Sequence, residues 1–198
     1  MIFILRPLLT APAVILSLAL AASLAQADSS HMTVTTPLMS FEKPDDEPRW
    51  IAVNDGVMGG LSRGGPRLAD GKLHFEGVLS LENNGGFSST RTIGRTFDLS
   101  GKSTMVLRVM GDGRRYQLRL ATDARFRGAA VSYGAEFATT DGQWTEVRIA
   151  FAELAPSFRG NALDGPPVNL AQVEEIGVMV GDKREGPFRL AVDWIGVQ

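Results

Sequence analysis

From residue 72 onward, hydrophobic and polar residues alternate along the chain with the period of two that is typical of β-strands. The clearest run is 72–81, and the same alternation predicts strands at 105–109, 116–120, 130–138, 144–151, 175–181 and 188–197. The hydrophobic side of these strands is expected to form the core. The expected core residues are Leu73, Phe75, Leu79, Leu107, Val109, Leu118, Leu120, Val147 and Ile149.

Asp-Gly pairs separate several of these runs, at 70–71, 112–113 and 141–142. This dipeptide supplies the positive φ angles that tight hairpin turns require. Only two segments, near 152–154 and 170–174, are candidates for short helices. The sequence therefore predicts an all-β fold, a β-sandwich or jelly roll, with no internal repeat and no second domain.

The first residues have a different character. Residues 8–24 are almost wholly apolar, with Arg6 before them and Ala25-Gln26-Ala27 after them. This arrangement predicts a secretory signal peptide over 1–27 that is cleaved before Asp28. A retained membrane anchor is the alternative, but Pro7 and Pro12 interrupt the apolar stretch.

We accordingly expect an exported protein, periplasmic or secreted, with no membrane span after cleavage. Residues 28–40 are expected to be an exposed lead-in, and 38–42 is a candidate edge strand. Residues 41–198 are expected to form a single β-sandwich domain.

Composition excludes several classes of site. The chain has 20 basic and 22 acidic residues, a net charge of −2, two histidines and no cysteine. Disulfides, thiolate metal sites and a cysteine nucleophile are therefore excluded. Without a basic stripe, nucleic acid is not an expected partner. We expect no cofactor and no metal ion.

One segment, Gly60–Gly64, fits the G-x-S-x-G pattern of serine hydrolases around Ser62. That mechanism needs the serine on a strand-to-helix turn with a histidine nearby. Here Gly65-Pro66 follows, and His74 falls on the predicted solvent side of its strand. We interpret the match as chance and expect no enzyme activity.

Two segments, 50–62 and 83–91, hold more glycine, asparagine and aspartate than one hairpin needs. They are expected to meet on one face, with Asp55 paired to Arg91, because a guanidinium offers a planar fork to a carboxylate. Both a purely structural cluster and a ligand- or partner-binding cluster fit this pattern. The candidate residues are Asp55, Asn84, Arg91, Tyr116 and Arg159.

The same segments carry a resemblance to a known family. The matching stretches run in order through Trp50, 54–62, Phe75-x-Gly77, 84–91, 111–116, Trp144, 156–160, Gly177, 186–188 and 192–195. On these residues the chain resembles the complex I intermediate-associated protein 30 family. The resemblance implies a galactose-binding-like β-sandwich. It also implies a non-catalytic role like that of assembly factors for respiratory NADH:ubiquinone oxidoreductase (complex I).

Two functions follow as hypotheses. In the first, the domain binds a protein partner in the envelope or membrane. In the second, it is a carbohydrate-binding module of the cell envelope, with Trp50, Tyr133 and Trp144 as candidate stacking residues, although each also fits a core position. A structural calcium ion held by Glu42 and Asp193 is a lesser alternative, if the terminal strands pair.

Overall fold

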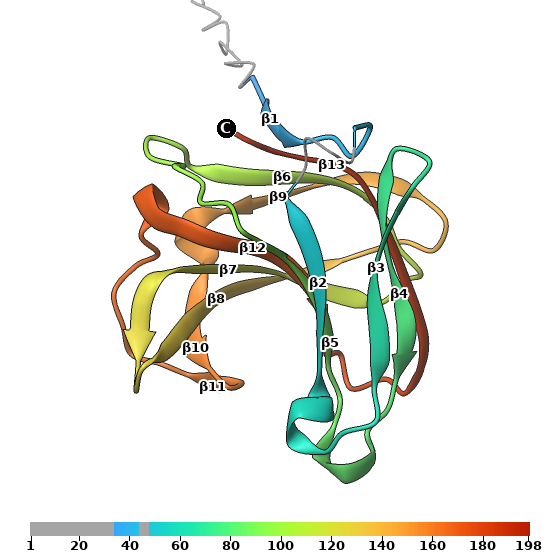
Figure 1. Ribbon diagram of the computed structural model, residues 1–198. Coiled ribbons are helices and arrows are strands. Elements are labelled where there is room, and N and C mark those ends of the chain that lie inside the picture. The colour runs from blue at the N-terminus through green and yellow to red at the C-terminus, as the bar shows by residue number, and fades with distance from the viewer. Residues whose placement is uncertain (1–33, 44–47) are drawn as a thin grey trace, which may run out of the picture. The chain divides into compact units, whose positions relative to one another are not determined.

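The computed structural model describes residues 34–43 and 48–198, which form two packed β-sheets (Figure 1). The predicted signal peptide and its cleavage site lie outside the described residues. No helix in the described part of the chain is both long enough and apolar enough to cross a membrane.

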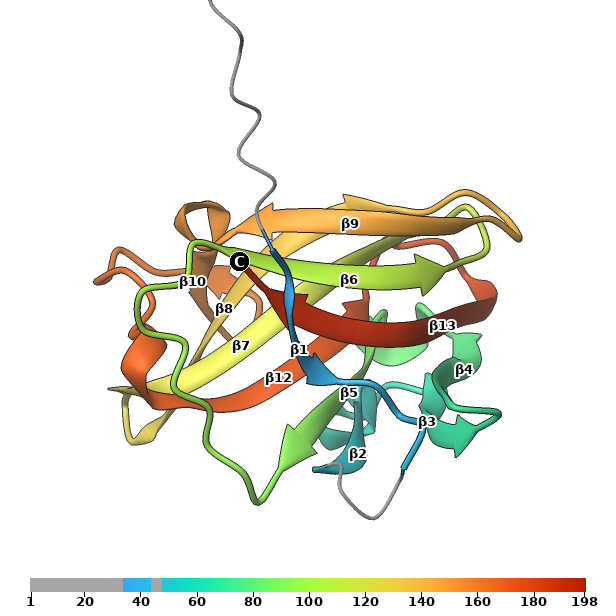
Figure 2. The ribbon, with the colours of Figure 1, turned by 90° about the horizontal axis from the view of Figure 1, so that it is seen from above.

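The first sheet, sheet A, has the strand order β3-β4-β13-β6-β9, and β1 also pairs with β13. In Figure 2, β9, β6 and β13 lie across β8, β7 and β12 of the other sheet. The strands of sheet A are β1 (Thr36–Met39), β3 (Arg63–Ala69), β4 (Lys72–Leu79), β6 (Thr104–Met110), β9 (Trp144–Ala150) and β13 (Gly186–Val197).

The second sheet, sheet B, has the order β11-β10-β8-β7-β12-β5-β2. The pairs β7–β8, β7–β12, β5–β12 and β2–β5 are antiparallel. Its strands are β2 (Arg49–Asn54), β5 (Ser88–Ile93), β7 (Arg115–Phe126), β8 (Ala129–Ala138), β10 (Ala155–Phe158), β11 (Asn161–Ala162) and β12 (Val173–Val180).

The core lies between the two sheets and contains the alternating residues that the sequence indicated. Eight of the nine expected core residues are buried, and Val147 is partly buried against the same cluster. The Asp70-Gly71 pair has positive φ at both residues and closes the β3–β4 hairpin, as expected. The all-β prediction is therefore confirmed.

Some boundaries differ from the prediction. The first strand is Thr36–Met39 rather than 38–42, and Met39 is buried, so the exposed lead-in ends before residue 40. The expected short helices are 3₁₀ turns at Phe151–Glu153 (η4) and Leu170–Gln172 (η5). Strands β2, β3, β5, β10 and β11 are additional to the seven predicted from alternation.

Candidate functional site

The two glycine-rich segments fold against each other around one buried carboxylate. The first forms the 3₁₀ turn η2 (Asp55–Met58) after β2, and the second forms η3 (Glu82–Asn84) before β5. In Figure 1 these turns lie side by side in cyan and green, beyond the ends of β2 and β5. The expectation that the two segments meet is confirmed.

Asp55 is fully buried between them and accepts four hydrogen bonds. One carboxylate oxygen accepts from the Ser62 amide at 2.9 Å. The other accepts from Ser62 Oγ at 2.5 Å and from the amides of Gly86 at 2.6 Å and Phe87 at 3.2 Å. These bonds join both segments through one side chain, because their donors lie 7 to 32 residues away along the chain.

The electrostatics of Asp55 reflect two opposing effects. Burial alone would raise the pKa of this carboxyl group, because desolvation disfavours its charged form. The hydrogen bonds from Ser62, Gly86 and Phe87 outweigh burial and hold the pKa of Asp55 below its ordinary value. The carboxylate is thus ionised at neutral pH and acts as a fixed acceptor for backbone amides.

Close approach explains why glycines surround this carboxylate. A β-carbon at Gly60 would lie 2.4 Å from Asp55 Cγ, and one at Gly85 would lie 2.6 Å from Asp55 Oδ2. Side chains at either position would therefore displace the carboxylate from its donors. The glycine content of the two segments serves this packing.

The same loops present apolar side chains to solvent. Of the seven large hydrophobic side chains that are exposed in the described residues, four lie on the loops that contain η2 and η3, with Leu81 directly before η3. We call this set the apolar tip: Val57, Met58, Leu61 and Leu81. Val57 is 77% exposed and Met58 57% exposed. Solvent-facing hydrophobic side chains on two adjoining loops are a feature of interaction surfaces.

The expected Asp55–Arg91 ion pair is wrong. Arg91 points to the outer face of sheet B and donates from Nη1 to Glu175 Oε2 at 2.7 Å. The reason is strand alternation, because Ser88, Thr90 and Thr92 of β5 face inward and Arg91 falls on the opposite side. Asp55 uses amide donors in place of a guanidinium.

The other candidate residues do not gather at one site. Asn84 is exposed in η3 with a φ of 58°. Tyr116 is fully buried, and its hydroxyl hydrogen-bonds to the Arg189 carbonyl and to Asp112. Arg159 follows β10, which β8, β7 and β12 separate from β5 and Arg91. The candidate cluster therefore divides between the loop pair, the core, the outer face of sheet B at β5, and the β10–β11 end of that sheet.

The hydrolase-like serine is part of the loop packing. Ser62 is buried. Its Oγ donates a hydrogen bond to Asp55 and accepts one from the Ser80 amide at 3.0 Å. We expect Ser62→Ala to lower the free energy of unfolding by about 1–3 kcal/mol, since it leaves the Ser80 amide without an acceptor. We expect the same variant to leave any esterase rate unchanged. Thermal melts and a chromogenic ester assay measure both quantities, and a hundredfold loss of esterase rate would refute the structural assignment.

The aromatic candidates for sugar stacking are mostly withdrawn from the surface. Tyr133 is buried, and Trp50 packs against the core and Phe41. Trp144 lies beside Lys72 and Arg108, whose cationic groups are 6.0 and 5.7 Å from its ring centre.

The calcium alternative loses support from one of its two ligands. The terminal strands do pair, but Asp193 forms ion pairs with Lys72 and Arg108. Among the described residues, no group of three or more acidic or histidine side chains is placed to hold a metal ion.

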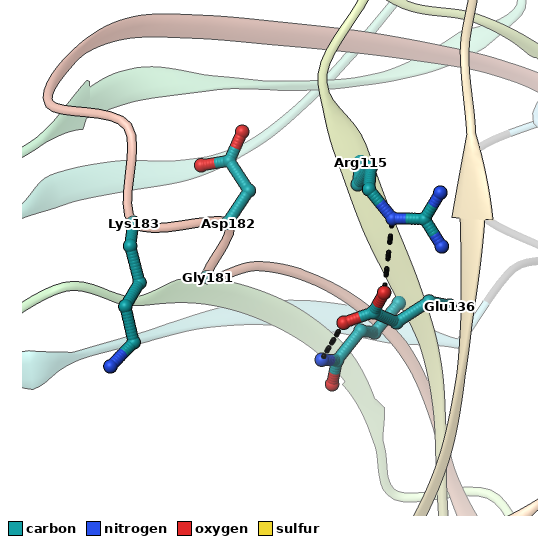
Figure 3. A pocket seen from close by; sticks show the side chains of 6 residues that line it. Arg115, Glu136, Gly181, Asp182 and Lys183 are labelled. Carbon is teal, nitrogen blue, oxygen red and sulfur yellow. Dashed lines mark hydrogen bonds and ion pairs between the residues drawn. The ribbon is translucent and has the colours of Figure 1, made fainter.

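Polar side chains also lie on the outer face of sheet B, on its central strands. In register across the sheet, Arg91 on β5 pairs with Gly177 on β12, and Gly177 pairs with Arg119 on β7. At one end of this face a hollow of about 230 Å³ is bounded by charged groups, including Arg115 and Glu136 (Figure 3). These two residues form an ion pair at 3.0 Å.

This architecture defines a β-sandwich of the kind found in carbohydrate-binding modules. The family 11 carbohydrate-binding module of the cellulase Lic26A-Cel5E of Clostridium thermocellum superposes with a TM-score of 0.62 at 14% identity, over 83% of this chain and 94% of the module. The same module in complex with a β-1,3-1,4-mixed-linked tetrasaccharide also gives a TM-score of 0.62. At this identity the likeness concerns the fold.

The chain belongs to the complex I intermediate-associated protein 30 (CIA30) family, whose model matches residues 39–192. The mitochondrial complex I intermediate-associated protein 30 of Mus musculus is 30% identical over 79% of this chain and 54% of its own length. The Drosophila melanogaster protein is 24% identical over 83% of this chain and 63% of its own length. The chain thus spans roughly half to two thirds of these relatives.

Sequence reasoning did not single out two features of the structure, the exposed hydrophobic side chains of the apolar tip and Arg119, which forms no ion pair in the described part of the chain. The glycine-rich segment contains three hydrophobic residues that follow no strand period: Val57, Met58 and Leu61. Hydrophobic residues in a turn are the one sequence feature that indicates exposed hydrophobic side chains there. The alternation of β7 marks Arg119 only as a polar position. Its surroundings come from β5, β8 and β12, which the local sequence does not identify.

Proposed function

We propose that this protein is a non-catalytic binding domain that assists the assembly of a respiratory NADH:ubiquinone oxidoreductase, and that it holds a protein partner on the apolar tip. The observation that carries this proposal is the position of the tip. Its four exposed hydrophobic side chains lie on the two glycine-rich loops interlocked around Asp55. Three of them lie within the stretch 54–62, which also carries the family resemblance.

The physical argument concerns the cost of exposing these side chains. Four hydrophobic residues on loops fixed by a buried carboxylate gain nothing for the fold from their exposure to water. Burial against a partner would remove apolar area from water at about 25 cal/mol per Å². A loop pair that is already ordered also loses little conformational entropy on binding. Membership of the CIA30 family supports complex I assembly as the setting.

The proposal also includes location. We propose that residues 1–27 direct export, so that the mature domain acts from outside the cytoplasm on a membrane-bound complex. Carbohydrate binding is the alternative, but it rests on a fold likeness at 14% identity, and two of its three candidate aromatic residues pack into or against the core.

The experiment is deletion of the gene in the source organism, followed by complementation with the full chain. We expect the deletion to lower the amount of assembled NADH:ubiquinone oxidoreductase on native gels, together with the membrane NADH–quinone activity, and the gene to restore both. Succinate–quinone activity of the same membranes is the control and should not change. An unchanged complex in the deletion strain would refute the assembly role.

A further inference from the structure

The outer face of sheet B displays a guanidinium with no anionic partner. Arg119 is partly buried in the middle of the sheet. Its hydrogen-bond partners are uncharged: Ser132 Oγ at 2.7 Å, Gln117 Oε1 at 3.3 Å and the Met179 sulfur at 3.7 Å. No ion pair involves Arg119 within the described ranges 34–43 and 48–198. Burial, together with the nearby Arg91 charge, lowers the pKa of Arg119.

The arginine beside it is incompletely satisfied. Arg91 donates from Nη1 to Glu175, but its Nε is buried and has no hydrogen-bond partner in the part of the chain that the structure describes. Buried polar groups are normally paired, because an unpaired donor costs about 1–3 kcal/mol. Two neighbouring guanidiniums therefore retain capacity for an acceptor that this chain does not itself supply.

Glycines lower the surface around both side chains. Gly177 lies between Arg91 and Arg119 in register, and a β-carbon there would come within 2.9 Å of Arg91 Cβ. Gly134, on the other side of Arg119, would place a β-carbon 3.1 Å from Arg119 Cδ. The row thus alternates arginine with glycine, and in it the Arg91 side chain is 37% exposed and Arg119 is partly exposed.

Of the four arginines in β5 and β7, three form ion pairs with glutamates and Arg119 forms none with any described residue. Glu175 pairs with Arg91, and Glu136 pairs with Arg115 and also accepts from Gln117. Arg119 remains between them. A carboxylate would neutralise the charge of Arg119 and accept two parallel hydrogen bonds from its guanidinium group.

We infer that this face binds a carboxylate-bearing peptide segment, with Arg119 as its main contact and Arg91 as the second; the inference rests on the proposed function, because the segment would belong to the protein partner. Neighbouring outward positions include the hydrophobic residues Ile51, Val53, Ile93 and Met179. The outward positions that pair across β5, β12, β7 and β8 carry no aromatic ring for stacking a sugar. Mixed aliphatic and cationic groups suit an acidic peptide.

The test is an NMR titration of the purified wild-type protein with hexaglutamate, and with hexaglutamine as the uncharged match. We expect hexaglutamate to shift the Nε–Hε signals of Arg119 and Arg91 and the amide of Gly177, and hexaglutamine to leave them in place. The Arg119→Gln variant should bind hexaglutamate about tenfold more weakly. Arg115→Gln, on the same face but already paired and exposed, should keep its affinity within about twofold.

Equal shifts with both peptides, or no shift at the two arginines, would overturn the inference, and neither result depends on a variant. Tighter binding of trigalacturonate than of hexaglutamate at the same residues would overturn the peptide class in favour of an acidic sugar. If the gene restores the respiratory complex while hexaglutamate fails to bind, this inference alone is wrong. If hexaglutamate binds and the deletion has no effect, the proposed function is wrong and the site stands.

Discussion

Replacing Asp55 by alanine should remove a large part of the free energy that stabilises the folded protein. The carboxylate accepts hydrogen bonds from the amides of Ser62, Gly86 and Phe87, and alanine would leave all three without an acceptor. At 1 kcal/mol or more for each stranded donor, we expect a loss of about 3–5 kcal/mol in the free energy of unfolding. Small domains are stable by about 5–15 kcal/mol in total. Chemical denaturation followed by tryptophan fluorescence measures the change.

The matched control is Asp98→Ala. Asp98 also accepts hydrogen bonds from a nearby residue, Ser100, which likewise lowers the pKa of its carboxyl group, but this turn is exposed. We expect the control to cost about 1 kcal/mol or less. A loss at Asp55 no larger than the loss at Asp98 would show that the two loops do not depend on the buried carboxylate.

The same carboxylate makes stability depend on pH. Because the pKa of Asp55 is lower in the folded protein than in the unfolded chain, its contribution is fully present above the unfolded value, about 4. The contribution is lost as the pH falls below about 4 towards the folded pKa. Asp55→Asn removes this titration. The stability difference between wild type and Asp55→Asn should therefore be constant at neutral pH and should shrink in acid.

Charging the apolar tip should abolish partner binding and leave the fold unchanged. Val57 is 77% exposed, so Val57→Asp removes no core contact, yet it would place a charge inside the proposed interface. Together with Met58→Asp we expect more than about a hundredfold loss of partner affinity, because each buried unpaired charge costs several kcal/mol. In the deletion strain the double variant should fail to restore the respiratory complex.

Val34 provides the control for the tip variants. It is 80% exposed and lies before β1, away from both loops in sequence. Val34→Asp makes the same chemical change as Val57→Asp at nearly the same exposure, and we expect it to restore the complex as wild type does. Equal restoration by the tip variant and by Val34→Asp would exclude the tip as the docking surface.

The predicted and missed strands differ for a physical reason. Strands such as β4 and β13 bury hydrophobic side chains on alternate positions, so their period is visible in the sequence. In β5 the inward residues are Ser88, Thr90 and Thr92, which are fully buried but satisfied by hydrogen bonds. Because these inward residues are polar, β5 shows no alternation of hydrophobic and polar residues in the sequence. In β3, Gly64, Gly65 and Pro66 likewise hide the strand.

The sequence predicted that the two loops meet at Asp55, but it predicted the wrong partner for the Asp55 carboxylate. The excess of glycine correctly indicated two loops packed together around Asp55. The sequence could not reveal that the acceptor would be satisfied by backbone amides, because every residue except proline carries one. Arg91 looked like the natural partner by charge, but its position in β5 sends it to the other face of the sheet. Partner choice here depends on three-dimensional geometry that residue types do not encode.

The most direct test of the proposed function is photo-crosslinking from the apolar tip in living cells. A photo-reactive amino acid is placed at Val57 in one strain and at Val34 in another, and adducts are identified by mass spectrometry after irradiation. We predict a discrete covalent adduct from position 57 with a subunit or assembly intermediate of the NADH:ubiquinone oxidoreductase, and none from position 34. The absence of that adduct from position 57, in cells whose complex requires this protein for assembly, would contradict the account.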